Sequence, residues 1–118
     1  AGFVQPADII KFYQASKMLI FPTRSDPWGL VANESLAAGL PVLVSSFAGV
    51  ADELVINGFN GFLFENFETH SWVEKIYQLL KDEDLYNNMS KNAIHSVDQY
   101  THIEAAKAIY NAAKLANI

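Results

Sequence analysis

Short apolar runs that alternate with segments of helical periodicity are the feature that most limits how this chain folds. Runs at 18–21, 42–45 and 61–64 are bounded by Pro, Gly or polar turn residues and have the length of strands. The first two have the composition of strands that are covered on both faces. Strands that alternate with helices pair in parallel through right-handed crossovers. The sequence therefore predicts an α/β fold in which helices flank one parallel sheet.

Helical periodicity predicts the segments that cover this sheet. A helix over about 6–17 carries a loose apolar stripe that includes Tyr13, and residues 30–38 form a second helix that ends at a glycine. The C-terminal half is expected to be mainly helical, with helices through 73–80, over 84–93 and around 103–113.

The composition narrows the class of protein. Of the 118 residues, 51% are hydrophobic, which excludes wholesale disorder and is enough for a single core. A net charge of −5 without a basic cluster argues against nucleic acid as a partner. Because the chain has no cysteine, a disulfide framework, an iron–sulfur cluster and thiol catalysis are excluded. No apolar run approaches the ~20 residues that span a bilayer, and we expect a cytoplasmic protein.

The loop at 23–29 and the helix that follows it form the first candidate site. Strand-to-helix loops at the carboxyl ends of parallel strands are where open α/β sheets bind ligands. The opening N–H groups of the helix have no intrahelical partner, and with the helix dipole they favour a phosphate or sugar oxygen. Asp26 precedes the helix and Glu34 lies about one turn inside it, with seven residues between them. Two carboxylates so placed predict a polyhydroxylated ligand that is held through its hydroxyls.

Each of these residues also has a purely structural interpretation. Asp26 before Pro27 can start a turn or pair with Arg24, and Glu34 is favourable near a helix start without any ligand. Trp28 can anchor the loop or join the core instead of stacking on a ligand. The spacing alone leaves both interpretations open.

Two further sets of residues carry weaker signals. The loop at 46–53 again joins a strand end to a glycine and a helix start, which by itself is a weak phosphate-loop pattern. His70, His95 and His102 have no ligand spacing. The sequence therefore predicts no metal site.

Residues 21–44 carry a long motif. It places two acids around a Pro-Trp-Gly-Leu-Val core and continues as Ala-Ala-Gly-Leu-Pro-Val, and residues 49–53 and 57–63 extend it. Together these residues resemble the signature of glycosyltransferase family 4, the retaining GT-B enzymes, and the similarity extends more loosely over nearly the whole chain. The resemblance implies a Rossmann-like parallel sheet, the C-terminal part of the donor-binding domain of a GT-B fold.

The resemblance also implies a reaction, the retaining transfer of a hexosyl group from a nucleotide-diphosphate sugar to an unknown sugar, lipid or polysaccharide acceptor. In such enzymes the acid that matches Glu34 binds the ribose hydroxyls of the donor. The acid that matches Asp26, the catalytic candidate, faces the transferred sugar. Backbone groups that approach the sugar and the diphosphate complete the expected donor site: Trp28, Gly29, Leu30, Val31 and Gly49. No metal or other cofactor is required in that scheme.

Two positions depart from the family pattern. The first acid is usually Glu, and Asp26 is one methylene shorter, so either its loop lies closer to the sugar or the contact differs in kind. A glycine pair is often found in the second loop, where this chain has Ala48 and Gly49. Gly49 is therefore the candidate for close backbone approach.

A full enzyme of this family has two Rossmann-like domains, and residues 1–118 resemble only the later part of the second. We expect one partial domain, inactive alone, without the N-terminal acceptor domain or the basic pair that grips the diphosphate. The full-length enzyme is expected to be cytoplasmic or peripheral to the membrane. In the strand order 3-2-1-4-5-6, Phe3-Val4 corresponds to strand 3, and the strand at 18–21 has a free edge. That edge predicts a homo-oligomer, or a chain that has lost its first half by truncation.

The alternative function is a non-catalytic α/β binding or assembly module with a degenerate glycosyltransferase fold. Two carboxylates around a helix opening favour the enzyme, because an interaction module does not need them. A flavodoxin-like receiver is disfavoured, since it needs an acidic cluster after its first strand, where this chain has Gln5-Pro6.

Overall fold

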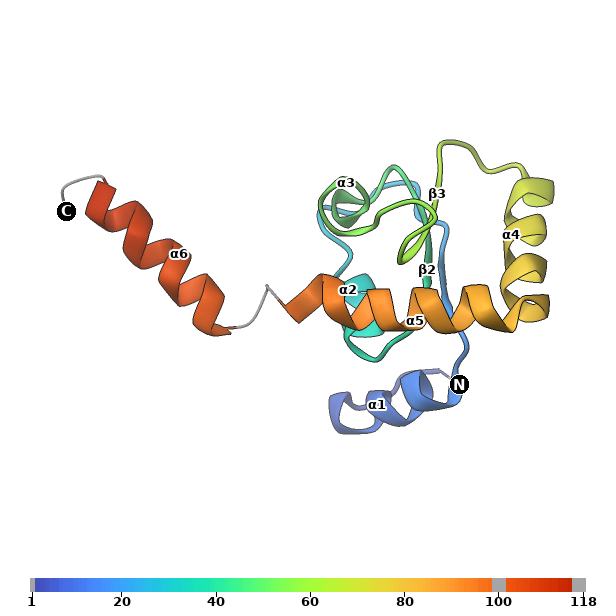
Figure 1. Cartoon of the computed structure of the whole chain (residues 1–118), viewed down its shortest axis with the longest axis horizontal. Helices are drawn as coiled ribbons and strands as arrows, with labels where there is room; N and C mark the ends of the chain where they lie inside the picture. The colour runs from blue at the N-terminus through green and yellow to red at the C-terminus, as the bar shows by residue number, and fades with distance from the viewer. Residues whose placement is uncertain (1, 99–101, 116–118) are drawn as a thin grey trace.

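The computed structural model describes residues 2–98 and 102–115, which form a parallel sheet with helices around it (Figure 1). In chain order the elements are α1 (Pro6–Ala15), β1 (Leu19–Phe21), α2 (Leu30–Ala37), β2 (Val42–Ser45), α3 (Gly49–Leu54), β3 (Gly61–Phe64), α4 (Thr69–Lys81), α5 (Glu83–Asp98) and α6 (His102–Leu115). None of these helices is long and apolar enough to cross a membrane.

The sheet has the order β1-β2-β3, with both strand pairs parallel. Leu19 lies opposite Val42, and Val42 lies opposite Gly61 on its other side. All four residues of β2 are buried, because this strand has a neighbour on each edge and helices over both faces. The three predicted strands and their parallel order are therefore confirmed.

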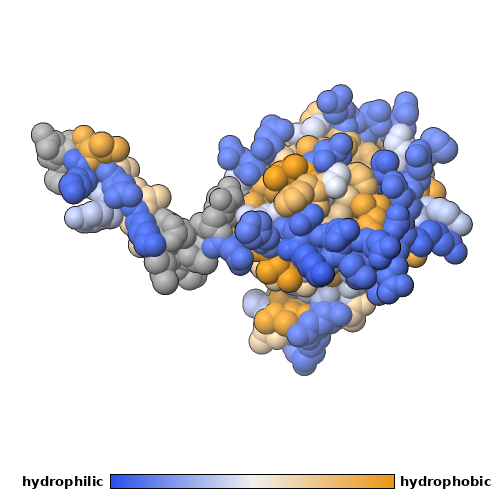
Figure 2. All heavy atoms as spheres, in the orientation of Figure 1, coloured by the Kyte–Doolittle hydropathy of each residue, from blue (hydrophilic) through white to orange (hydrophobic). Residues whose placement is uncertain are grey.

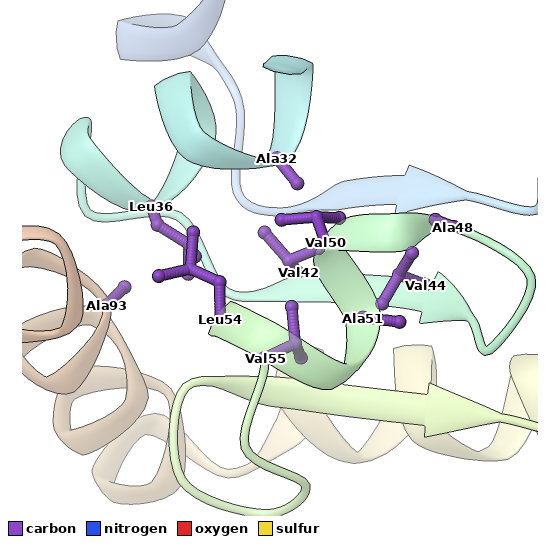
Figure 3. Close-up of a cluster of buried hydrophobic side chains, with 10 residues drawn as sticks. All are labelled: Ala32, Leu36, Val42, Val44, Ala48, Val50, Ala51, Leu54, Val55 and Ala93. Atoms are coloured by element: carbon purple, nitrogen blue, oxygen red, sulfur yellow. The ribbon is translucent and has the colours of Figure 1, made fainter. Parts of the chain in front are cut away.

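Alternate residues of β2 supply two separate cores. Val42 and Val44 pack with residues of α2 and α3 on one face of the sheet (Figure 3). Leu43 points to the opposite face, where it packs with side chains of β3, α4 and α5. Such a division follows from the two-residue period of a strand, which sends neighbouring side chains to opposite faces. Helix α2, which begins at the candidate site, therefore packs on the sheet through apolar side chains.

The strand at the edge differs from its prediction. Residues 18–21 were expected to be covered on both faces, but β1 begins at Leu19 and Ile20 is 46% exposed. The prediction of a strand at Phe3-Val4 is also wrong, and Phe3 is 87% exposed. In the doubly wound order two strands would stand between that segment and β1, and the described residues do not supply them. The outer edge of β1 therefore has no strand beside it within the described residues.

Several helix boundaries are set by contacts that the sequence pattern does not reveal. Helix α1 ends at Ala15, two residues before the predicted end, because Ser16 donates its N–H to the Tyr13 carbonyl and its hydroxyl to the Phe12 carbonyl. Helix α5 extends to Asp98, beyond the predicted end at 93. The predicted C-terminal helix is confirmed as α6, which lies apart from the sheet in Figure 1. Figure 2 shows apolar surface on both α1 and α6.

A buried asparagine fastens the turn before β3. Asn60 is fully buried, accepts the N–H of Ile56 at 2.7 Å and donates to the Leu54 carbonyl at 2.9 Å and to the Ser96 hydroxyl at 2.7 Å. Gly58 adopts a φ of +81° in the same turn, as expected of a residue that tolerates positive φ. The turn is thereby attached to α5 as well as to the sheet.

Candidate functional site

The loops that follow β1 and β2 meet at the carboxyl edge of the sheet. Asp26 pairs with Ala48 in a parallel bridge, and Gly49 donates its N–H to the Asp26 carbonyl at 3.0 Å. Val50 donates its N–H to the Trp28 carbonyl at 2.6 Å. The Ser45 hydroxyl, at the end of β2, donates to the Thr23 carbonyl. These bonds join the two loops side by side. Parallel topology predicts this proximity, because it places the carboxyl ends of β1 and β2 at the same edge of the sheet.

Two glycines make this close packing possible. A Cβ at Gly49 would overlap the carbonyl oxygen of Pro27 and lie 2.9 Å from its carbonyl carbon. Gly29 has a φ of +90°, and a Cβ there would lie 2.9 Å from a ring carbon of Phe21. Gly49 was predicted to let its backbone approach a donor, but the group that it approaches in this structure is the first loop. Its contact with a donor stays a prediction.

Asp26 combines a turn role with a position at the site. Its Oδ1 accepts the N–H of Trp28 at 3.0 Å, so the turn that was one of the two interpretations is present. The other structural interpretation, an ion pair with Arg24, is not found among the described residues. The Arg24 guanidinium lies 5.2 Å from the ring centre of Phe67 instead. One carboxylate oxygen of Asp26 thus orders the loop at the opening of α2.

The opening of α2 presents backbone N–H groups. Gly29 is its N-cap residue, and Ala32 donates its N–H to the Gly29 carbonyl at 2.9 Å. The N–H groups of Leu30 and Val31 come before the first intrahelical bond, so they are free to meet an acceptor. Together with the positive end of the helix dipole they favour an anion or a sugar oxygen.

Trp28 lies at the surface beside this opening. The residue is 38% exposed, and its indole Nε1 donates to Oδ1 of Asn33 at 2.7 Å. Because Asn33 lies on α2, the bond holds the ring against the helix that it precedes. The ring is therefore an anchored surface group and not a core residue.

Glu34 is exposed on α2 and has a partner that the sequence analysis missed. The Tyr13 hydroxyl, 21 residues earlier on α1, donates to Oε2 of Glu34 at 2.6 Å. Burial, and then the hydrogen bond and negative charge of Glu34, raise the pKa of Tyr13 to about 12, against a smaller opposing effect of the Ser35 hydroxyl. The sequence placed Tyr13 on an apolar stripe, and only the packing of α1 beside α2 reveals its polar role.

A hollow of about 540 Å³ lies between α1 and α2, with Tyr13 and Glu34 in its lining. This volume is in the range of small-molecule sites. No group of three or more His, Asp or Glu residues able to hold a metal ion occurs in the described part of the chain. His70 and His95 are exposed, and the side chain of His102 lies outside the described residues.

A model of the family described as Glycosyl transferases group 1 matches residues 1–96 of this chain. The chain belongs to this family. It is 33% identical over 85 residues to an uncharacterized glycosyltransferase of Methanocaldococcus jannaschii, and 28% identical over 106 residues to D-inositol 3-phosphate glycosyltransferase of Corynebacterium aurimucosum. The matches cover 72% and 90% of this chain but 24% and 25% of the relatives. The group 1 chain described above thus spans about a quarter of their length.

The fold of this group 1 glycosyltransferase chain also matches a solved structure. Anabaena HepE, in a crystal structure with UDP-glucose, aligns with a TM-score of 0.83 and 26% sequence identity. That match covers 100% of this chain and 32% of HepE. The predictions of membership in a glycosyltransferase family and of the α/β fold of a GT-B domain are therefore confirmed.

Replacing Gly49 by Ala is expected to destabilise this group 1 chain by about 3 kcal/mol or more, because the added methyl group would force the two loops apart. Gly58→Ala is the matched control. It has a positive φ of +81°, but a Cβ there meets no heavy atom within 4 Å, so we expect only about 1–2 kcal/mol from backbone strain. Urea unfolding measures both free energies. Equal losses would contradict the tight contact between the loops.

Proposed function

We propose that this chain is the donor-binding part of a retaining glycosyltransferase of family 4, which transfers a hexosyl group from a nucleotide-diphosphate sugar. The observation that carries the proposal is the open N-terminus of α2 with a carboxylate on each side, Asp26 before it and Glu34 beyond its first turn. The likeness to HepE, whose crystal structure contains UDP-glucose, supports a donor of this class. The acceptor is a sugar, lipid or polysaccharide.

Each part of the site takes one part of the donor. The carboxylate of Glu34 accepts hydrogen bonds from the ribose hydroxyls, and the N–H groups of Leu30 and Val31 donate to diphosphate or sugar oxygens. Asp26 faces the transferred sugar through the carboxylate oxygen that is not needed for the turn. When the bond between the anomeric carbon and the diphosphate oxygen breaks, the positive end of α2 stabilises the charge that develops on the departing nucleoside diphosphate.

The chain alone is proposed to bind the donor without transferring its sugar, because it spans about a quarter of the length of its relatives. An alternative is a binding or assembly module that has lost catalysis. The two differ in one property that is easily measured, since only a donor site requires selective affinity for one nucleoside diphosphate.

Titration of the chain with UDP, GDP and ADP is expected to give selective binding of one of them, in the millimolar range or about −4 kcal/mol. Glu34→Ala should weaken that binding by about tenfold or more, because hydrogen bonds to a charged group are lost. Glu74→Ala, which removes an exposed carboxylate from α4, serves as the control and should leave the affinity unchanged. Absence of binding by all three nucleotides to a folded chain would favour the non-catalytic module.

Asp26 is expected to act on the sugar and not on the nucleotide. Asp26→Asn keeps an oxygen that can accept the Trp28 N–H, so the turn survives while the negative charge is removed. We expect the variant to bind the preferred nucleoside diphosphate as the wild type does and to bind its hexose conjugate about tenfold more weakly. An equal loss for both ligands would assign Asp26 to the loop alone.

The outer edge of β1, which no strand of the described residues covers, is proposed to pair with a second copy of this chain. Ile20 is exposed on this strand, and an unpaired apolar edge invites a further strand. Sedimentation velocity over a dilution series should then reveal a dimer. Ile20→Lys should shift it to monomer, whereas Leu80→Lys, at an exposed position on α4 away from β1, should not. A monomer at every concentration would contradict the pairing.

A further inference from the structure

Tyr13 and Glu34 form the one long-range bond between the side chains of α1 and α2 that the described residues show. The hydroxyl of Tyr13 lies 2.6 Å from Oε2 of Glu34, although the two residues are 21 positions apart. Both also belong to the lining of the hollow between the helices. The bond therefore lies at a place where a ligand can reach it.

The direction of this hydrogen bond determines which carboxylate oxygen of Glu34 can still accept a hydrogen bond from a ligand. An ionised carboxylate only accepts, so the phenol must be the donor. Oε2 receives the phenol proton, and Oε1 is left to accept a hydroxyl of a ligand. The raised pKa of Tyr13, about 12, keeps the phenol protonated throughout the neutral range, so the donor is always present.

We propose that Tyr13 is a positioning residue, which holds the Glu34 carboxylate in the orientation that accepts the ribose hydroxyls of the donor. This inference rests on the proposed function of Glu34. An exposed glutamate that moves freely loses side-chain entropy on binding, and a fixed one has lost part of that entropy beforehand. Tyr13 therefore raises affinity for ligands with ribose hydroxyls, and only for those.

A purely structural role makes a different prediction. If the bond merely fastens α1 to α2, its loss lowers the stability of the chain and changes the affinity for every ligand alike. The discriminating readout is therefore the ratio of affinities for a ribonucleotide and for the same nucleotide without ribose hydroxyls.

The test uses the 118-residue chain and the one nucleoside diphosphate, UDP, GDP or ADP, that it binds, with the 2′,3′-dideoxy form of that nucleotide as the second ligand. In NMR titrations Tyr13→Phe is expected to weaken binding of the ribonucleotide about threefold to tenfold and to leave the dideoxy form unchanged. In a Glu34→Ala background the same substitution should have no further effect. Tyr86→Phe, another half-buried tyrosine, is the matched control and should change neither affinity.

The outcomes separate this inference from the proposed function. Binding of the ribonucleotide that Tyr13→Phe leaves intact, or that falls equally for both ligands, would overturn the positioning role and leave the donor site standing. A wild-type chain that binds no nucleotide would overturn both. The bond itself is checked without ligand, by following the ultraviolet absorbance of the phenolate: Glu34→Ala should lower the pKa of Tyr13 from about 12 toward its ordinary value. An unchanged pKa would overturn the inference.

Discussion

The contact between two backbones, at Gly49 and Pro27, is the constraint on which the site depends. Because Gly49 has no side chain, the loop after β2 lies directly against the loop after β1 and bonds to it through the N–H groups of Gly49 and Val50. Each loop leads into a helix, so their union fixes where α2 and α3 begin. The position of the unpaired N–H groups at the start of α2 is therefore fixed by the sheet and by both loops, and not by the first loop alone.

One strand, β2, positions the helices on both faces of the sheet. Because β2 is buried on both faces, Val42 and Val44 pack against α2 and α3, while Leu43 packs against the helices of the opposite face. The sequence predicted this part well, because apolar runs, their lengths and the glycine or proline at their ends are local signals. The motif around Asp26 and Glu34 is local too, and its helix begins where the motif predicts. Membership in a glycosyltransferase family followed from the same residues, whereas family 4 and retention stay predictions.

The features that were not predicted depend on contacts between distant segments. Ile20 belongs to an apolar run but is exposed on the face of the sheet opposite α2, and Phe3 has no strand beside it among the described residues. Tyr13 was placed on an apolar stripe, because its polar partner lies 21 residues away on another helix. For Asp26 the spacing left a turn and a ligand role open, and the structure has the turn without excluding the ligand, since the turn uses one of the two carboxylate oxygens.

The charge distribution of this chain makes the two carboxylates more important for the proposed donor site than a cationic group. A net charge of −5 opposes the approach of a diphosphate, and α2 offers only the partial charge of a helix dipole. Arg24, the basic residue within the motif, lies over the Phe67 ring. The proposed donor site therefore relies mainly on hydrogen bonds that the hydroxyls of ribose and sugar donate to carboxylates. In the proposed site, a Glu34 carboxylate that the Tyr13 hydroxyl already orients would recognise such hydroxyls without a cationic partner for the diphosphate, so its orientation would affect affinity more than it would beside a strong cationic anchor.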